Sequence, residues 1–133
     1  MPLTDEQKWQ NRVDRTWERY RALSIQKCRN DCFKEYQKLR RLECSNNFGQ
    51  TWCISCGKQV QWNECDGGHF FSRTKLGTAF DPDNVWPQCK YCNRHLNGNL
   101  AEYQKSLIEK IGHQRLYILQ AKSEIATEIG KNE

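Results

Sequence analysis

The chain has 133 residues, eight of them cysteine, and a formal net charge of +5 at pH 7. This length predicts one domain, with room for an extension. The chain opens without the apolar core of a signal peptide, and no apolar run approaches the length of a membrane span. We therefore expect a cytoplasmic protein without membrane contact, in which paired cysteines bind metal rather than form disulfides.

The positive charge is concentrated in the first third of the chain. Residues 1–45 contain 11 Lys and Arg against 7 Asp and Glu, whereas the remaining residues are nearly balanced. An unevenly basic segment is typical of a part that meets a polyanion such as nucleic acid.

Residues from about 5 to 42 are predicted to form one long helix or two abutting ones, because no Gly or Pro interrupts them. Thr4 and Gln7 fit a capping box at the helix start. Apolar and semi-apolar side chains recur in steps of four and three, at Trp9, Val13, Thr16, Tyr20 and Leu23. We expect this stripe to pack against a second copy of the chain or against the C-terminal helices.

A basic stripe runs beside the apolar one, formed by Lys8, Arg12, Arg15 and Arg19. Their spacing places the four charges on a single helical face. The stripe fits a solvated face with Asp14 and Glu18 as neighbours and fits a phosphate-contacting face equally well. Further along the same segment, Cys28 and Cys32 are expected to be small buried side chains rather than metal ligands.

After this helical segment the pattern changes to short extended pieces and turns. Three extended pieces are expected, at residues 59–62, 69–72 and 85–88. Residues 73–83 are predicted to be a loop that closes in a turn. Two helices follow, one that ends at Gly112 and one from about residue 114 to 129.

Two Cys-x-x-Cys pairs enclose the extended region, at Cys53, Cys56, Cys89 and Cys92. Each pair can present two sulfurs to one ion, so the four thiolates suit a tetrahedral structural zinc. Such an ion has no open coordination position and cannot itself be catalytic. The alternative, two redox-active dithiols, lacks the surrounding strand and helix pattern of a thioredoxin-like fold.

Polar residues inside the enclosed region form a second candidate site. Asp66 and His69 flank Gly67 and Gly68, which we expect to allow a tight reversal at the start of a strand, and Asn93 directly follows the last cysteine. Carboxylate and amide oxygens are hard ligands suited to Mg²⁺, and a neutral histidine nearby could take a proton from an attacking water. The set is typical of metal-assisted phosphodiester hydrolysis. Taken singly, Asp66 also fits an Asx-turn.

The order Cys-x-x-Cys, Asp-x-x-His, Asn, Cys-x-x-Cys-Asn resembles that of the His-Me finger (HNH-type, ββα-metal) nucleases, in particular the endonuclease VII subgroup. The fuller string, from Gly-Gly-His-Phe to Asn-Arg-His-Leu-Asn-Gly-Asn-Leu, resembles the phage NinG/Rap recombination endonucleases. The detailed similarity covers roughly residues 52–112.

The resemblance implies a role for each polar residue of the second site. His69 would be the general base, and Asp66 and Asn93 would hold a catalytic Mg²⁺ or Mn²⁺. Asn84 would brace the loop that carries the histidine, although it also fits an ordinary turn residue. Common HNH enzymes have a metal-binding acid or histidine where this chain has Gly68, and a histidine where it has Asn93. Both departures agree with the endonuclease VII pattern.

The resemblance also implies an architecture. We expect an α+β, mostly helical fold in which a zinc-linked ββα-metal core lies between a long N-terminal helix and C-terminal helices. The expected division is a helical extension for DNA binding and dimerisation, a nuclease core and a C-terminal helix, at residues 1–45, 46–112 and 113–133.

The expected function is a Mg²⁺-dependent DNA endonuclease for branched recombination intermediates, such as Holliday or D-loop junctions. It would act as a homodimer through the N-terminal helix, in the host cytoplasm if a phage encodes it. Further DNA contacts are expected from Arg73, Lys75, Lys90, Arg94 and His95. Two alternatives stay open, which are a zinc-stabilised DNA-binding module without catalysis and a nicking nuclease that ignores DNA structure.

Overall fold

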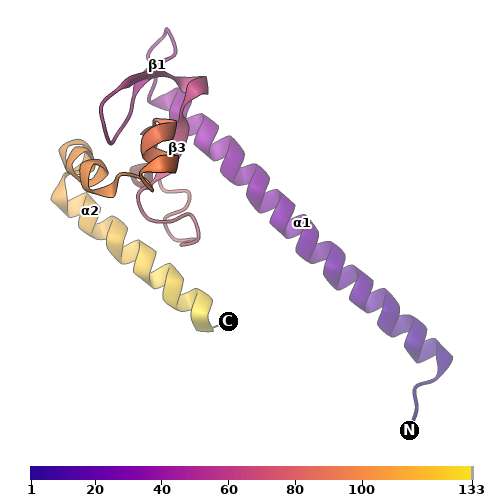
Figure 1. Ribbon diagram of the computed structural model, residues 1–133. Helices are drawn as coiled ribbons and strands as arrows, with labels where there is room; N and C mark the ends of the chain where they lie inside the picture. Colours follow the sequence, from indigo (N-terminus) through magenta and orange to yellow (C-terminus); the bar gives the residue numbers. More distant parts are fainter. Residues whose placement is uncertain (133) are drawn as a thin grey trace. The chain divides into compact units, whose positions relative to one another are not determined.

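The structure, a computed structural model, describes residues 1–132, with side chains described for residues 1–23 and 25–125 (Figure 1). Its helices and strands are α1 (Asp5–Glu43), β1 (Gln50–Trp52), β2 (Gln59–Gln61), β3 (Asp66–His69), β4 (Val85–Gln88) and α2 (Leu100–Asn132). The chain divides into two compact units, Met1–Lys34 and Glu35–Glu133. Over the described residues, neither helix contains a stretch long and apolar enough to cross a membrane.

Helix α1 is continuous, so the N-terminal segment forms one helix rather than two. The predicted capping box is present: the Thr4 N–H donates to Gln7 Oε1 at 2.9 Å, and the Gln7 N–H donates to Thr4 Oγ1 at 3.2 Å. Acidic residues occupy the first turn and Arg40 and Arg41 the last, where each sign of charge suits the helix dipole.

The first unit exposes its apolar stripe. Trp9 is 64% exposed, Tyr20 61% and Leu23 72%. Cys28 and Cys32 are exposed as well, so the prediction that they are buried was wrong. The reason is that they lie on a helix whose surface is solvent-accessible along nearly all of its first 32 residues.

The strands form two small antiparallel sheets. In the first, β1 pairs with β2, and in the second, β3 pairs with β4 so that Asp66 lies opposite Gln88 and His69 opposite Val85. The predicted strand at 69–72 is therefore displaced, because the ladder uses Asp66–His69 and the chain turns away into a loop after it. The predicted strands at 59–62 and 85–88 are confirmed, the first shortened to Gln59–Gln61.

Gly67 and Gly68 lie inside β3 and do not form the predicted reversal. Their role is to leave space. A Cβ atom on Gly67 would lie 2.9 Å from the Cβ of Gln37, and one on Gly68 would lie 2.0 Å from Oε1 of Gln88. Neighbouring side chains therefore pack directly on the backbone of this strand.

The core of the second unit joins the sheets to the first part of α2. It consists of Ile54, Tyr103, Leu107 and Ile111, with Phe70, Trp86 and Leu116 packed against it. At Gly112 the backbone leaves the helical conformation with φ 82° and ψ 164°, which glycine adopts without strain. The predicted break there is confirmed, and the mostly helical α+β class is confirmed with it.

The last turns of α1 belong to this second unit. The Arg40 side chain is buried, its Nε donates to the Val85 carbonyl at 2.8 Å, and its guanidinium lies 4.8 Å from the ring centre of Trp86. Arg41 donates to the Trp62 carbonyl at 2.9 Å. These two arginines fasten the helix end to backbone carbonyls of the sheet region, a role that their sequence pattern did not reveal.

Candidate metal centre and the polar site beside it

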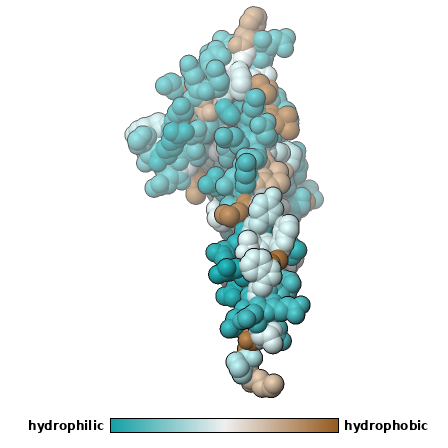
Figure 2. All heavy atoms as spheres, turned by 90° about the vertical axis from the view of Figure 1, so that its right-hand side faces the viewer, coloured by the Kyte–Doolittle hydropathy of each residue, from teal (hydrophilic) through white to brown (hydrophobic). Residues whose placement is uncertain are grey.

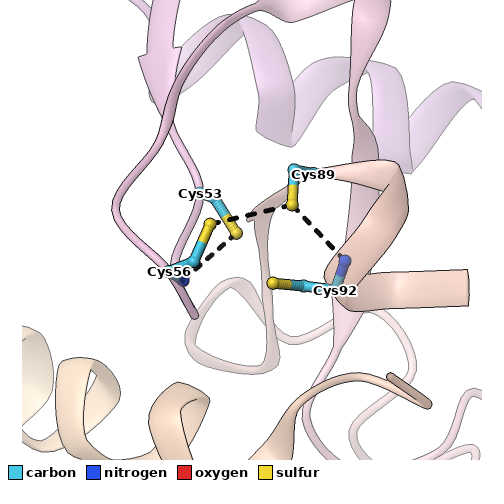
Figure 3. A group of neighbouring side chains, drawn as sticks. All are labelled: Cys53, Cys56, Cys89 and Cys92. Carbon is cyan, nitrogen blue, oxygen red and sulfur yellow. Dashed lines mark hydrogen bonds between the residues drawn. The ribbon is translucent and has the colours of Figure 1, made fainter. Parts of the chain in front are cut away.

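Four cysteines converge on one point. Cys53 and Cys56 lie in the turn between β1 and β2, Cys89 follows β4, and Cys92 lies in a short π-helix, Tyr91–His95. Their sulfurs are all within 4.8 Å of one another and face a common centre (Figure 3). The Cys56 and Cys89 sulfurs are 3.8 Å apart, which matches the edge of about 3.8 Å of a tetrahedron with Zn–S bonds of about 2.3 Å.

The chemistry of the cluster agrees with this geometry. The backbone N–H of Cys56 points at Cys53 Sγ at 3.5 Å and that of Cys92 at Cys89 Sγ at 3.4 Å, which favours thiolates. Burial, opposed by the hydrogen bond from Asn99, raises the pKa of the Cys92 thiol to about 12. A cation at the centre removes this penalty, since a coordinating thiol is deprotonated. The predicted ligand set therefore fits a structural zinc ion.

Asp66 meets two residues of the π-helix. Asn93 donates through Nδ2 to Asp66 Oδ2 at 2.9 Å, and Arg94 donates through Nε to Oδ2 and through Nη2 to Oδ1, both at 3.0 Å. The cysteine cluster brings these side chains together, because Asp66 pairs with the residue before Cys89, and Asn93 directly follows Cys92. Asn93 and Arg94 both lie in the wide turn of this π-helix, a kind of turn that is frequent at functional sites.

The two side chains at this point carry oxygens of the kinds that suit a hard divalent cation. A carboxylate and an amide, from segments 27 residues apart, are held within hydrogen-bonding distance. Mg²⁺ and Mn²⁺ prefer oxygen ligands of these kinds and keep several waters. The structure brings these two side chains together, and it adds Arg94, which sequence reasoning had assigned only to DNA.

His69 lies at the other end of β3 and is largely buried. Its Nε2 lies 2.9 Å from the Ala79 carbonyl. A carbonyl oxygen can only accept, so Nε2 carries the hydrogen and Nδ1 is the basic nitrogen of the neutral ring. Burial lowers the pKa of His69, and the Arg73 charge adds to this while the Ala79 bond opposes it. The ring is therefore neutral at pH 7.

Asn84 is fully buried and closes the loop between β3 and β4. Its Nδ2 donates to the carbonyls of Phe71 at 2.9 Å and Thr78 at 3.0 Å, and its Oδ1 accepts from the Phe71 N–H at 2.8 Å. Thr78 precedes the residue whose carbonyl holds His69. The Asn84 side chain thus holds the loop whose Ala79 carbonyl contacts the histidine.

Comparison with known proteins places the chain. The family model described as "Bacteriophage Lambda NinG protein" matches residues 3–131. The chain belongs to the NinG family. It is 45% identical over 65 residues to the protein ninG of Salmonella phage P22, which is 45% of this chain and 30% of that protein. It is 40% identical over 67 residues to the protein ninG of Escherichia phage lambda, which is 47% of this chain and 30% of that protein.

The aligned segments thus span less than a third of the length of these two NinG relatives. No solved structure matches the chain.

The predicted DNA contacts of this NinG-family chain fall in both units. Those of α1 are exposed, and Arg12 borders an apolar groove of about 440 Å³ along the helix. The groove is lined by Trp9, Arg12, Val13, Thr16, Trp17 and Tyr20. In Figure 2 pale aromatic rings lie in a row among teal polar side chains in the lower part of the view.

The remaining predicted contacts lie in the second unit. Arg73 and Lys90 are exposed, and Lys75 is half-buried with its Nζ 5.7 Å from the ring centre of Phe71. The His95 ring lies 5.6 Å from that of Tyr91. Arg94 is the one of these five that the structure joins to Asp66.

Two supporting residues were not singled out from the sequence of this NinG-family chain. The Tyr103 hydroxyl, fully buried, donates to the Gly68 carbonyl at 2.7 Å and so holds β3 between Asp66 and His69. Gln88 is also fully buried and donates to Ser55 Oγ at 2.9 Å. The hydroxyl partner of Tyr103 depends on the strand pairing, which helical periodicity does not contain.

Proposed function

We propose that this NinG-family protein is a Mg²⁺- or Mn²⁺-dependent DNA endonuclease that hydrolyses phosphodiester bonds in branched recombination intermediates, such as Holliday or D-loop junctions. The observation that carries the proposal is the meeting of the Asp66 and Asn93 side chains, 2.9 Å apart, where Asp66 lies on the same strand as the partly buried His69. The antiparallel pair β3–β4, followed by the turn that bears Asn93, supports the ββα-metal core expected from the resemblance.

Asp66 and Asn93 would hold the catalytic cation through a carboxylate and an amide oxygen. When bound, such a cation stabilises negative charge on the phosphoryl and leaving oxygens of the substrate. The fully cysteine-ligated zinc has no part in the reaction, since it has no open position. Its role is to hold the segments that carry Asp66 and Asn93.

His69 would remove the proton from the attacking water. Its neutral ring takes the proton at Nδ1, because Nε2 already donates to the Ala79 carbonyl. The lowered pKa keeps this nitrogen unprotonated at neutral pH, and it also makes the nitrogen a weaker base. Asn84 acts as a positioning residue through the loop, not by contact with the substrate.

Exposed and half-buried basic residues would supply the surface for DNA. Lys8, Arg12, Arg15 and Arg19 would contact phosphates along one arm, and Arg73, Lys75, Lys90 and His95 would do so around the site. A junction needs two opposed cuts, which two copies related by a two-fold axis provide. The uncovered stripe of α1 is the candidate surface for that homodimer, and the working compartment would be the host cytoplasm.

The test offers a four-way junction and a linear duplex of the same sequence, with Mg²⁺ and then Mn²⁺, to zinc-loaded protein. Wild type should cut the junction in preference to the duplex. His69→Ala should bind both DNAs as wild type does and lose at least about 100-fold in cleavage rate. His113→Ala is the matched control, because His113 is exposed and lies outside the site.

The same experiment separates the other two functions. The exposed basic face of α1 favours a zinc-stabilised binding module, and that function predicts junction binding without cleavage by any variant. A structure-independent nicking nuclease predicts equal, His69-dependent cleavage of junction and duplex. Absence of cleavage by wild type on either DNA with both metals would refute the endonuclease.

A further inference from the structure

Every oxygen of the Asp66 carboxylate already faces a hydrogen-bond donor. Arg94 engages both oxygens and Asn93 adds a third bond to Oδ2, each at 2.9–3.0 Å. Asn93 moreover turns its nitrogen, not its oxygen, toward the carboxylate. A cation needs an oxygen from each residue, so this arrangement must change before both can bind it.

Arg94 and Asp66 differ in exposure. The Asp66 side chain is 16% exposed and the Arg94 side chain 60% exposed. A carboxylate removed this far from water needs a counter-charge or strong hydrogen bonds. The guanidinium provides both from the solvent side, where it can turn away without unpacking any buried group. The pair is thus asymmetric, because the Asp66 carboxylate is fixed and the Arg94 guanidinium can move away.

We propose that Arg94 is an exchangeable counter-ion for Asp66, a positioning residue that occupies the carboxylate until a divalent cation replaces it. This inference rests on the proposed function, since it concerns the same metal-binding pair. On exchange the Asn93 amide rotates to present its oxygen, and the released guanidinium contacts a phosphate of the DNA. The planar guanidinium matches a phosphate as well as a carboxylate, since it offers two parallel N–H donors to either.

The exchange links metal and DNA thermodynamically. Without DNA, a cation must compete with Arg94, so the wild-type site binds metal weakly. With DNA present, the guanidinium gains a new partner and the competition falls. Because linkage is reciprocal, DNA must then raise metal affinity through Arg94.

The first measurement is Mn²⁺ binding by calorimetry to the zinc-loaded full chain without DNA. Arg94→Gln should bind Mn²⁺ about fivefold more tightly than wild type, the factor expected for loss of a partly exposed ion pair. Lys58→Gln is the matched control, since it removes one exposed positive charge from a turn that does not touch Asp66, and its affinity should not change. Asp66→Asn should abolish the binding.

The second measurement repeats the titration with a four-way junction bound, in a His69→Ala background that prevents cleavage. The junction should tighten Mn²⁺ binding about tenfold, within the usual range of coupling between two sites. In His69→Ala/Arg94→Gln the junction should change Mn²⁺ affinity by less than twofold.

The outcomes distinguish a failure of the Arg94 counter-ion exchange from a failure of the proposed metal pair, Asp66 and Asn93. If Asp66→Asn abolishes Mn²⁺ binding but Arg94→Gln binds no more tightly than wild type, the counter-ion exchange is wrong and the metal pair stands. If neither wild type nor Arg94→Gln binds Mn²⁺, with or without the junction, or if Asp66→Asn binds it unchanged, both proposals fall together.

Discussion

The two compact units are built in opposite ways. Met1–Lys34 is helix along nearly its whole length, and several of its larger apolar side chains, such as Trp9 and Leu23, are more than half exposed. Glu35–Glu133 has only short strands, yet it buries polar groups such as Asn84 and Arg40 on backbone partners. The first unit therefore leaves much of its apolar surface open to solvent, and the second fixes side chains relative to one another.

Arginine shows the difference at the level of one residue type. Arg12 borders an open groove on α1, and Arg40, on the same helix, is buried and hydrogen-bonded to β4. A change in the first unit should alter binding and leave stability intact. A change in the second should alter stability and the site together.

Loss of a cysteine ligand should have the largest effect. Cys92→Ser removes a nearly fully buried member of the cluster, and structural zinc contributes on the order of 10 kcal/mol to the folding of small domains. We expect loss of one zinc per chain and collapse of the near-ultraviolet dichroism, with part of the helical signal retained by α1. Cys28→Ser, at an exposed cysteine, should change neither. A Cys92→Ser protein with full zinc content would contradict this contrast between the two units.

The next effect is expected at Gly68. Its added Cβ would lie 2.0 Å from Gln88 Oε1, so Gly68→Ala should lower the free energy of unfolding by about 3 kcal/mol. Chemical denaturation measures this. Gly68→Ala/Gln88→Ala removes the clash, so the two changes should be strongly non-additive. Simple additivity would mean that the strand does not depend on this contact.

The fall in cleavage activity at acidic pH reports on the protonation of His69. Because its pKa is lowered by burial, the basic form predominates at and above pH 6.5 and is lost as the pH falls through the folded-state value. Cleavage should fall tenfold per pH unit on the acidic side of a midpoint below 6.5, with DNA binding monitored in parallel. Arg73→Gln should move the midpoint upward, since the Arg73 charge helps to lower the pKa. A midpoint unaffected by His69 replacement would identify another group.

The smallest effect on stability is expected in the first unit. Arg12→Gln/Arg19→Gln should change the free energy of unfolding by no more than about 0.5 kcal/mol, because both side chains are exposed. DNA binding should weaken, and its logarithmic salt dependence should decrease by about 2, close to one per lost phosphate contact. Arg21→Gln, an exposed arginine outside the basic stripe, serves as control. An unchanged salt dependence would mean that the stripe is only a solvated face.

The sequence predicted what depends on local spacing. The bounds of α1 follow from its capping box and the absence of Gly and Pro, and the cysteine cluster follows from two Cys-x-x-Cys turns. The break at Gly112 is likewise a local property. The helix bounds and the break need no knowledge of which distant segments meet, and the cluster needs only that two recognisable Cys-x-x-Cys pairs share one ion.

The features that the sequence predicted wrongly or did not reveal depend on pairing between distant segments. Gly67 and Gly68 suggested a reversal, whereas the space they leave is filled by Gln37 and Gln88 from elsewhere in the chain. The bidentate contact of Arg94 with Asp66 joins residues 28 apart and needs the cluster to be assembled first. Charge and spacing alone cannot reveal either arrangement.

The direct attachment of the polar pair to the cysteine cluster has a consequence for the order of events in a newly made chain. Asp66 lies opposite the residue before Cys89, and Asn93 follows Cys92, so neither reaches its place until the cluster closes. A freshly synthesised protein that has not yet acquired zinc would lack the paired oxygens on which the proposed cutting depends. Metal supply would thus act as a maturation step that keeps unfinished copies harmless to DNA.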